Sequence, residues 1–154
     1  DSDYQRGFKV GISKVLRNSA SRIVSFKTLN YLENIIEYEL CQRNDLNESI
    51  FFNEKGNLCE GCTTNIFIIK DKVIYTPSIK CGLLPGIVRQ WIINNFDVIE
   101  KEITREELLN SDEVFLTNSL VGVIKVSNIE NKLFNSEIIE KIKEQYDKAI
   151  NGGE

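Results

Sequence analysis

Histidine and methionine are both absent from this sequence of 154 residues. Without histidine, the chain cannot build a Ser-His-Asp triad or a histidine-ligated metal site, so acid–base chemistry falls to lysine, carboxylates, tyrosine or cysteine. No apolar run approaches the roughly 18 residues that a membrane-spanning helix needs, and the first residues lack the pattern of a signal peptide. We therefore expect a cytoplasmic protein with reduced cysteines and no membrane partner.

Length and charge indicate one globular domain. The chain has 42% hydrophobic and 27% charged residues, which is ordinary for a folded protein. Its net charge of −4 lacks the basic excess that nucleic-acid binding requires. Because the sequence opens on Asp1 and contains no methionine, we expect it to be part of a longer protein.

Strands and helices are predicted in mixed order. Apolar and β-branched runs predict strands over residues 8–16, 22–26, 48–53, 96–103, 112–118 and 121–129, and a hairpin over residues 64–77 with its turn at residues 70–72. The order lacks a strict βαβ rhythm, so the predicted fold class is α+β.

Four helices are expected between these strands. The first covers residues 29–41 and places Leu29, Leu32, Ile36 and Leu40 on one face. The second covers residues 84–96, with Pro85 in its first turn. The third covers residues 104–111 and begins with the capping-box pair Thr104 and Glu107, and the last is capped by Asn135 or Ser136.

Two cysteines at C-x-x-C spacing, Cys59 and Cys62, raise the question of a metal or redox site. A structural zinc site needs four soft ligands, but Cys41 and Cys81 are isolated in sequence and histidine is absent. A redox dithiol belongs at a helix start, whereas the residues that follow Cys62 have strand character. The sequence therefore predicts no metal site and four small, buried cysteines.

Several other residues could carry chemistry, each with an ordinary alternative. Lys27, between an apolar strand and a helix, is either exposed or a partly buried nucleophilic amine. Glu60, expected at the start of a strand, is either a surface acid or the partner of a cationic nitrogen. The amides from Gly86 to Val88 form either a plain helix start or an anion site.

Together these segments resemble the class IV aminotransferases, the fold-type IV pyridoxal-phosphate enzymes. That family includes branched-chain and D-amino-acid aminotransferases and aminodeoxychorismate lyase. The resemblance rests on the motifs E-x-x-x-x-N-I-F from Glu60 to Phe67 and L-P-G-I-x-R from Leu84 to Arg89. The segment "KTLNYLENI" over residues 27–35 and the strand–loop–strand over residues 105–126 also resemble family segments.

The resemblance implies a role for each matched residue. Lys27 would bind pyridoxal phosphate covalently, and Glu60 would contact its pyridine nitrogen. The remaining cofactor contacts would be Tyr31 at the phenolic oxygen, Leu84 on the ring, and Gly86, Ile87, Val88 and Ser119 at the phosphate, with Asn118 a candidate substrate contact. Val88 departs from the usual threonine and so loses one hydroxyl contact, a change of about 1 kcal/mol.

The resemblance also implies an architecture and a reaction. Residues 1–150 would form the cofactor-binding C-terminal domain of the D-amino-acid aminotransferase-like fold, a pseudo-barrel flanked by helices, with residues 151–154 as a tail. The resemblance further implies a smaller N-terminal domain that this sequence would lack, and a homodimer as the full-length protein. The compact "KTLNYLEN" resembles the lyases and the D-amino-acid enzymes, whereas branched-chain enzymes more often carry an extra glycine between lysine and tyrosine. Of these, we expect aminodeoxychorismate lyase of folate biosynthesis, which releases pyruvate and forms 4-aminobenzoate. The alternatives are a branched-chain or D-amino-acid aminotransferase, or a fragment without activity of its own.

Overall fold

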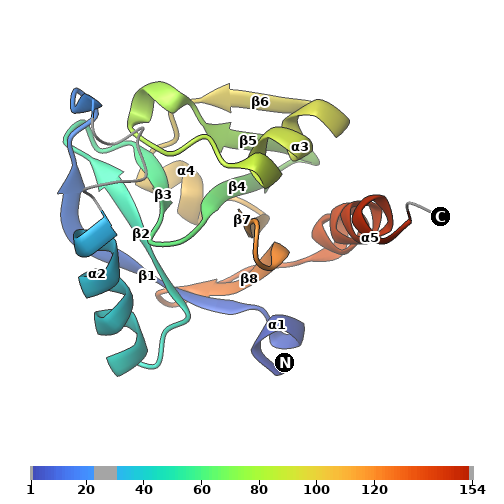
Figure 1. Cartoon of the computed structure of the whole chain (residues 1–154), viewed down its shortest axis with the longest axis horizontal. Helices are drawn as coiled ribbons and strands as arrows, with labels where there is room; N and C mark the ends of the chain where they lie inside the picture. The colour runs from blue at the N-terminus through green and yellow to red at the C-terminus, as the bar shows by residue number, and fades with distance from the viewer. Residues whose placement is uncertain (1, 23–30, 153–154) are drawn as a thin grey trace.

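A curled, mixed sheet forms the centre of the computed structural model, which describes residues 2–22 and 31–152 (Figure 1). Its strands follow the order β3-β2-β1-β8-β7-β4-β5-β6, and β9 pairs with β8. The strand bounds are β1 Phe8–Arg17, β2 Glu48–Asn53, β3 Leu58–Gly61, β4 Asn65–Lys70, β5 Val73–Pro77, β6 Val98–Lys101, β7 Glu113–Asn118, β8 Gly122–Ile129 and β9 Lys132–Leu133. The helices are α1 Ser2–Arg6, α2 Tyr31–Arg43, α3 Ile87–Asn95, α4 Arg105–Leu109 and α5 Glu137–Asn151, and a 3-10 turn, η2, covers Ile79–Cys81.

Two parallel strand pairs are connected through helices. Strands β1 and β2 are parallel and α2 lies between them in sequence, while β5 and β6 are parallel and are joined through α3. Parallel neighbours need such crossovers, because a short turn cannot return the chain to the same end of the sheet. The amino ends of α2 and α3 therefore follow the carboxyl ends of β1 and β5.

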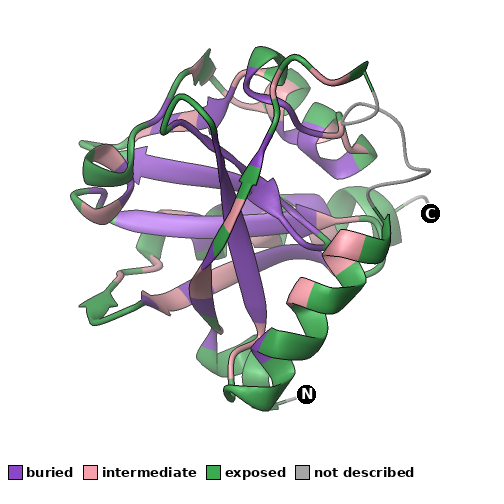
Figure 2. Cartoon of the chain, turned by 90° about the vertical axis from the view of Figure 1, so that its left-hand side faces the viewer, coloured by how far each residue is buried: buried purple, intermediate pink, exposed green. Residues whose placement is uncertain are grey.

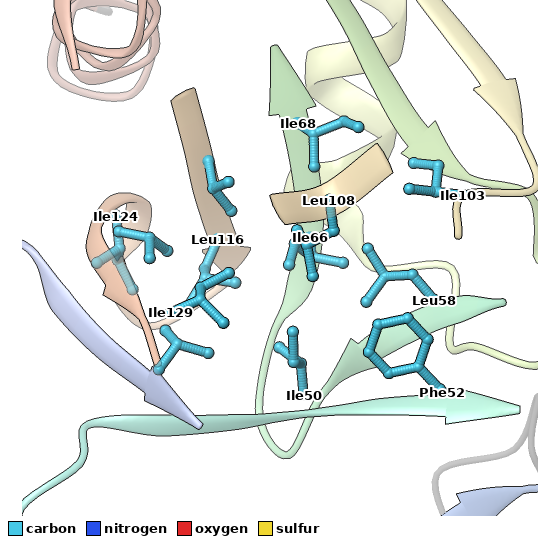
Figure 3. Packing of buried hydrophobic residues seen from close by; sticks show 13 residues of the cluster. Ile50, Phe52, Leu58, Ile66, Ile68, Ile103, Leu108, Leu116, Ile124 and Ile129 are labelled. Atoms are coloured by element: carbon cyan, nitrogen blue, oxygen red, sulfur yellow. The ribbon is translucent and has the colours of Figure 1, made fainter. Parts of the chain in front are cut away.

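Strand β4 separates two hydrophobic cores. Ile66 and Ile68 face the inside of the curled sheet, where they pack with residues of β2, β7 and β8 (Figure 3). Phe67 and Ile69 face the other side, as the two-residue repeat of a strand requires. Phe67 stacks there on Phe115 of β7, with ring centroids 4.7 Å apart.

Helices α3 and α5 cover the second core. Val88 and Ile92 of α3 and Ile139 and Ile142 of α5 are buried against the sheet. Figure 2 shows buried strands in the centre of the molecule and exposed helical surfaces around them. No helix within residues 2–22 and 31–152 is long and apolar enough to cross a membrane.

Most of the expected elements are confirmed, and so is the α+β half-barrel. The 64–77 hairpin turns at Asp71 and Lys72, which have φ values of 50° and 65°. The Thr104–Glu107 capping box is present, and it opens α4. The strand expected at residues 22–26 falls almost entirely outside the described residues, as do Lys27 and Leu29.

The expected apolar face of α2 is not a core face in this chain. Leu32, Ile36 and Leu40 are 66%, 51% and 45% exposed, and Cys41 is the buried residue of the helix. The helix itself is confirmed, but none of the elements in the described part of the chain covers this face. Burial depends on what packs against a helix, and the periodicity of its own sequence cannot reveal that.

Two helix starts also differ from expectation. Helix α3 begins at Ile87, so Pro85 precedes the helix, and Gly86 at its N-cap has extended backbone angles. Helix α5 receives no side-chain cap from Ser136. Two amides of its first turn, those of Ile138 and Ile139, donate to the Glu113 carboxylate at 3.0 Å. The acceptor therefore comes from a strand that is distant in sequence.

Candidate active site

Glu60 is a buried carboxyl group near the carboxyl end of β3, and not at the start of a strand as expected. The residue is 8% exposed, and its Oε2 accepts a hydrogen bond from the Leu84 backbone N–H at 3.0 Å. Burial raises the pKa of Glu60 to about 7, against the opposing effects of the Leu84 hydrogen bond and the Arg17 charge, while the Glu48 charge adds to the rise. A carboxyl group in this state suits pairing with a basic nitrogen.

Both backbone polar groups of Leu84 are hydrogen-bonded to side chains. Asn65, at the start of β4, donates from Nδ2 to the Leu84 carbonyl at 2.8 Å, while Glu60 accepts the Leu84 N–H. Gly86 lies so close to Asn65 that a Cβ on the glycine would overlap Asn65 Oδ1. Asn65 therefore accounts for one position in each of the two motifs: its own in the motif from Glu60 to Phe67, and Gly86 in the motif from Leu84 to Arg89.

The start of α3 offers free backbone amides. Its N-cap, Gly86, provides no side chain to accept them, and no capping hydrogen bond forms there. Ile87 is 82% exposed, whereas Val88 is buried in the second core. Unsatisfied N–H groups and the helix dipole together favour an anion at this point.

These two features lie close together. Leu84, whose N–H is bonded to Glu60, and Ile87 are three positions apart, so at most about 10 Å of chain joins their two N–H groups. One small molecule can therefore contact both. It would carry an anionic group at one end and a basic nitrogen at the other.

The β7–β8 turn is adjacent through strand pairing. Asn65 pairs with Thr117, the next residue is Asn118, and Asn118 pairs with Gly122. The Asn118 Oδ1 accepts the amides of Leu120 at 3.1 Å and Val121 at 2.9 Å, so it organises the turn. Ser119 is exposed in that turn.

Tyr31 is the first residue of α2 and is 62% exposed. Arg17, at the end of β1, holds the first turns of this helix: its Nη1 donates to Glu33 at 2.8 Å and its Nη2 to Asn34 Oδ1. The Arg17 guanidinium lies 3.9 Å above the Phe51 ring. Lys27 lies outside the described residues, so its prediction rests on the sequence.

Sequence reasoning missed three buried or bridging residues, Arg17, Asn34 and Glu48. Asn34 donates to the Cys62 carbonyl at 2.9 Å, and Glu48 accepts from residues 62–64. A charged residue inside an apolar strand can indicate a buried, paired charge, because charged side chains are seldom buried without partners. Arg17 and Glu48, however, stand at strand ends, where a charge is ordinarily exposed.

The motif arginine has a structural role. Arg89 is 1% exposed and donates from Nη2 to the Pro77 carbonyl at 3.1 Å and to Glu100 Oε1 at 2.5 Å. It joins α3 to the end of β5 and to β6. These contacts fix the orientation of the first turn of α3 relative to β5 and β6.

The four cysteines are free and buried, as predicted. Cys59 and Cys62 do not act as a pair: the Cys59 thiol donates to the Cys81 carbonyl at 3.1 Å, whereas Cys62 interacts with Cys41. Burial raises the pKa of the Cys59 thiol. No group of metal-ligating side chains occurs in the described part of the chain.

Known proteins of one family are similar to this chain. The family model of amino-transferase class IV matches residues 1–129. This chain belongs to the class IV aminotransferase family. Aminodeoxychorismate lyase of Bacillus subtilis is 32% identical over 131 residues, which cover 82% of the chain and 45% of that protein. D-alanine aminotransferase of Bacillus licheniformis is 34% identical over 115 residues, which cover 71% of the chain and 40% of that protein. The structure of the branched-chain aminotransferase of Thermoproteus uzoniensis, solved with norvaline, is 29% identical and has a TM-score of 0.90. The match covers 96% of this chain and 52% of that one.

Class IV aminotransferases use pyridoxal 5'-phosphate. The residues present fit that cofactor on two counts: the uncapped start of α3 suits its phosphate, and buried Glu60 suits its pyridine nitrogen. The chain spans about half the length of the relatives it matches, between 40% and 52% for the three above.

Proposed function

We propose that this chain is the cofactor-binding domain of a pyridoxal-phosphate enzyme. The observation that carries the proposal is the Leu84 segment, which is bonded to buried Glu60 and leads directly into the uncapped start of α3. When bound, pyridoxal phosphate supplies an electron-withdrawing ring that makes the α-proton of an amino substrate acidic. The chain's own residues would bind, orient and exchange protons around it.

Each residue has a task within this proposal. Glu60 holds a proton on the ring nitrogen, because an ionised carboxylate there favours the charged form of the nitrogen. The amides of Ile87 and Val88 bind the phosphate, and Gly86 leaves the approach free of a side chain. The sequence prediction supplies the rest: Lys27 would bind the cofactor and move the substrate's α-proton, Tyr31 would bond to the phenolic oxygen, Leu84 would pack on the ring, and Ser119 would donate to the phosphate.

The domain organisation is part of the proposal. Residues 1–150 would be the larger domain, and a smaller N-terminal domain would complete the substrate cleft in the full-length protein. The support is coverage, because the relatives are about twice as long as the matched segment. A homodimer in the cytoplasm remains our prediction.

For the reaction, we infer the aminodeoxychorismate lyase activity of folate biosynthesis. The 32% identity to the Bacillus subtilis lyase supports it. The short spacing between Lys27 and Tyr31 resembles the lyases and the D-amino-acid enzymes, and so it speaks only against a branched-chain aminotransferase. The reaction splits 4-amino-4-deoxychorismate into 4-aminobenzoate and pyruvate without a second substrate. A branched-chain or D-amino-acid aminotransferase is the second candidate, supported by the similar identity of those relatives.

Cofactor binding is tested by adding pyridoxal phosphate to this chain. We expect a visible absorbance band from lysine-bound cofactor, which disappears in Lys27→Ala and persists in the control Lys80→Ala, at an exposed residue of η2. Absence of the band in the wild-type chain, or its survival in Lys27→Ala, contradicts the assignment.

Reaction type is tested with the full-length protein. We expect 4-aminobenzoate and pyruvate to form in equal amounts from aminodeoxychorismate without any 2-oxo acid. Exchange between branched-chain or D-amino acids and 2-oxoglutarate, without 4-aminobenzoate, would instead establish the aminotransferase. Glu60→Ala should keep the cofactor but slow turnover by roughly a hundredfold or more, the usual scale for a group that supports proton transfer.

A further inference from the structure

The Glu48 carboxylate is buried and surrounded by hydrogen-bond donors. Glu48 is the first residue of β2 and is 0% exposed. Oε1 accepts the amides of Ser49 at 3.0 Å and Cys62 at 3.1 Å. Oε2 accepts the Thr63 amide at 3.0 Å, the Thr63 hydroxyl at 2.8 Å and the Thr64 hydroxyl at 3.1 Å. None of the described lysines or arginines forms an ion pair with it, so neutral dipoles stabilise the charge.

Four of these five donors belong to one short turn. Residues 61–64 connect the end of β3 to the start of β4, and the Gly61 amide closes the turn on the Thr64 carbonyl at 2.9 Å. The turn is packed tightly on Glu48, since a Cβ on Gly61 would lie 3.0 Å from the Glu48 carboxyl group. The turn therefore has little freedom while Glu48 keeps its contacts.

The same turn separates the two side chains that hold Leu84. Glu60 immediately precedes residues 61–64 and accepts the Leu84 N–H, and Asn65 immediately follows them and donates to the Leu84 carbonyl. The spacing of these two groups is thus set by the shape of the turn. The turn is also tied to α2, because Asn34 donates to the Cys62 carbonyl at 2.9 Å and itself accepts from Arg17.

We propose that Glu48 is a positioning residue, which fixes residues 61–64 and thereby aims the Glu60 carboxyl group at the Leu84 segment. The inference rests on the proposed function for its catalytic meaning, because the direction of Glu60 matters to a bound ring nitrogen. The effect of Glu48 on residues 61–64 and on Glu60 does not depend on a bound cofactor. Loss of the Glu48 contacts frees the turn, lets water reach Glu60 and weakens the burial that distinguishes this carboxyl group.

The experiment follows the ionisation of Glu60 in the cofactor-free chain by ¹³C NMR of the glutamate side-chain carboxyl carbons. The charged groups that act on Glu60 are Arg17 and Glu48, so a variant that changes neither charge separates positioning from electrostatics. Thr63→Val is that variant, because it removes only the hydroxyl that bonds to Glu48. We expect it to lower the Glu60 pKa, from about 7 in the wild type, by about half a unit or more, since rehydration favours the ionised form.

Three further variants serve as comparisons for Thr63→Val. Thr63→Ser keeps the hydroxyl and should leave the titration unchanged. Glu48→Gln should lower the Glu60 pKa at least as much as Thr63→Val. Glu113→Gln is the matched control, because Glu113 is also buried and also accepts backbone amides. Glu113 lies on β7 and binds the first turn of α5, away from residues 61–64. Its substitution should leave the Glu60 pKa unchanged.

An unchanged Glu60 titration in Thr63→Val overturns the proposal, and so does an equal shift in Glu113→Gln. If Glu48→Gln does not fold, Thr63→Val and Thr63→Ser alone decide. The titration needs no cofactor, so a failure of the proposed function leaves it intact. In the separate arm with pyridoxal phosphate and the full-length protein, Thr63→Val should keep the cofactor, as Glu60→Ala does, but slow turnover severalfold, while Thr63→Ser should not.

Discussion

The Glu60 carboxylate accepts the backbone N–H of Leu84 at 3.0 Å, across 24 residues of sequence. This bond joins the end of β3 to the segment that enters α3. A side chain that would contact the cofactor ring thus also fixes the backbone that would present amides to its phosphate. Changes at either residue should therefore affect both halves of the site.

Replacing Glu60 should change how stability depends on pH. The folded-state pKa of about 7 lies above the ordinary value of 4.5, so the folded chain binds the proton more tightly than the unfolded chain. Stability therefore falls as pH rises between those two values, by about 3 kcal/mol in total. Denaturant unfolding of wild type and Glu60→Gln from pH 4 to pH 8 measures this, and Glu60→Gln should lose about 3 kcal/mol less. Parallel pH profiles for the two proteins would contradict the raised pKa.

Gly86→Ala should destabilise the chain through Asn65. The backbone angles of Gly86, φ −69° and ψ 152°, suit alanine, so the cost comes from the overlap with Asn65 Oδ1. We expect a loss of about 1–3 kcal/mol in the free energy of unfolding, the usual range for overpacking. In an Asn65→Ala background the same substitution should cost much less. Equal costs in both backgrounds would show that Asn65 is not the obstacle.

Arg17→Met should destabilise the start of α2. The variant loses the bonds to Glu33 and Asn34 and leaves the Asn34 amide oxygen without its donor. A loss of about 2–4 kcal/mol in the free energy of unfolding is expected for a buried, hydrogen-bonded charge. Arg105→Met is the control, since Arg105 pairs with Glu130 on the surface and should cost at most about 1 kcal/mol. Similar losses would refute the anchoring role.

Two isoleucines test whether the outer face of α2 contributes to stability. Ile36 on α2 is 51% exposed, whereas Ile142 on α5 is 1% exposed. Ile36→Ala should change the free energy of unfolding by less than about 1 kcal/mol, and Ile142→Ala should lower it by about 2–5 kcal/mol. Thermal or urea unfolding of both variants provides the measurement. A large loss in Ile36→Ala would mean that this face is covered.

How far the sequence predicts the structure depends on distance along the chain. The Thr104–Glu107 capping box was predictable because its two residues lie three positions apart on one helix. The cap of α5 was not, because Glu113 reaches it from a strand 25 residues away. The position of Glu60 and its family motif were visible, but the reason for the motif lies in contacts with Leu84, Asn65 and Gly86 that only the folded chain brings together.

The buried carboxylate beneath residues 61–64 has a consequence for the rate at which this turn opens. Amides in loops ordinarily exchange their hydrogens with solvent quickly, because little structure must be broken to expose them. The Cys62 and Thr63 amides donate instead to Glu48, a residue without exposed surface. In hydrogen–deuterium exchange they should be protected as strongly as strand amides, so that this connection between two strands unfolds with the core.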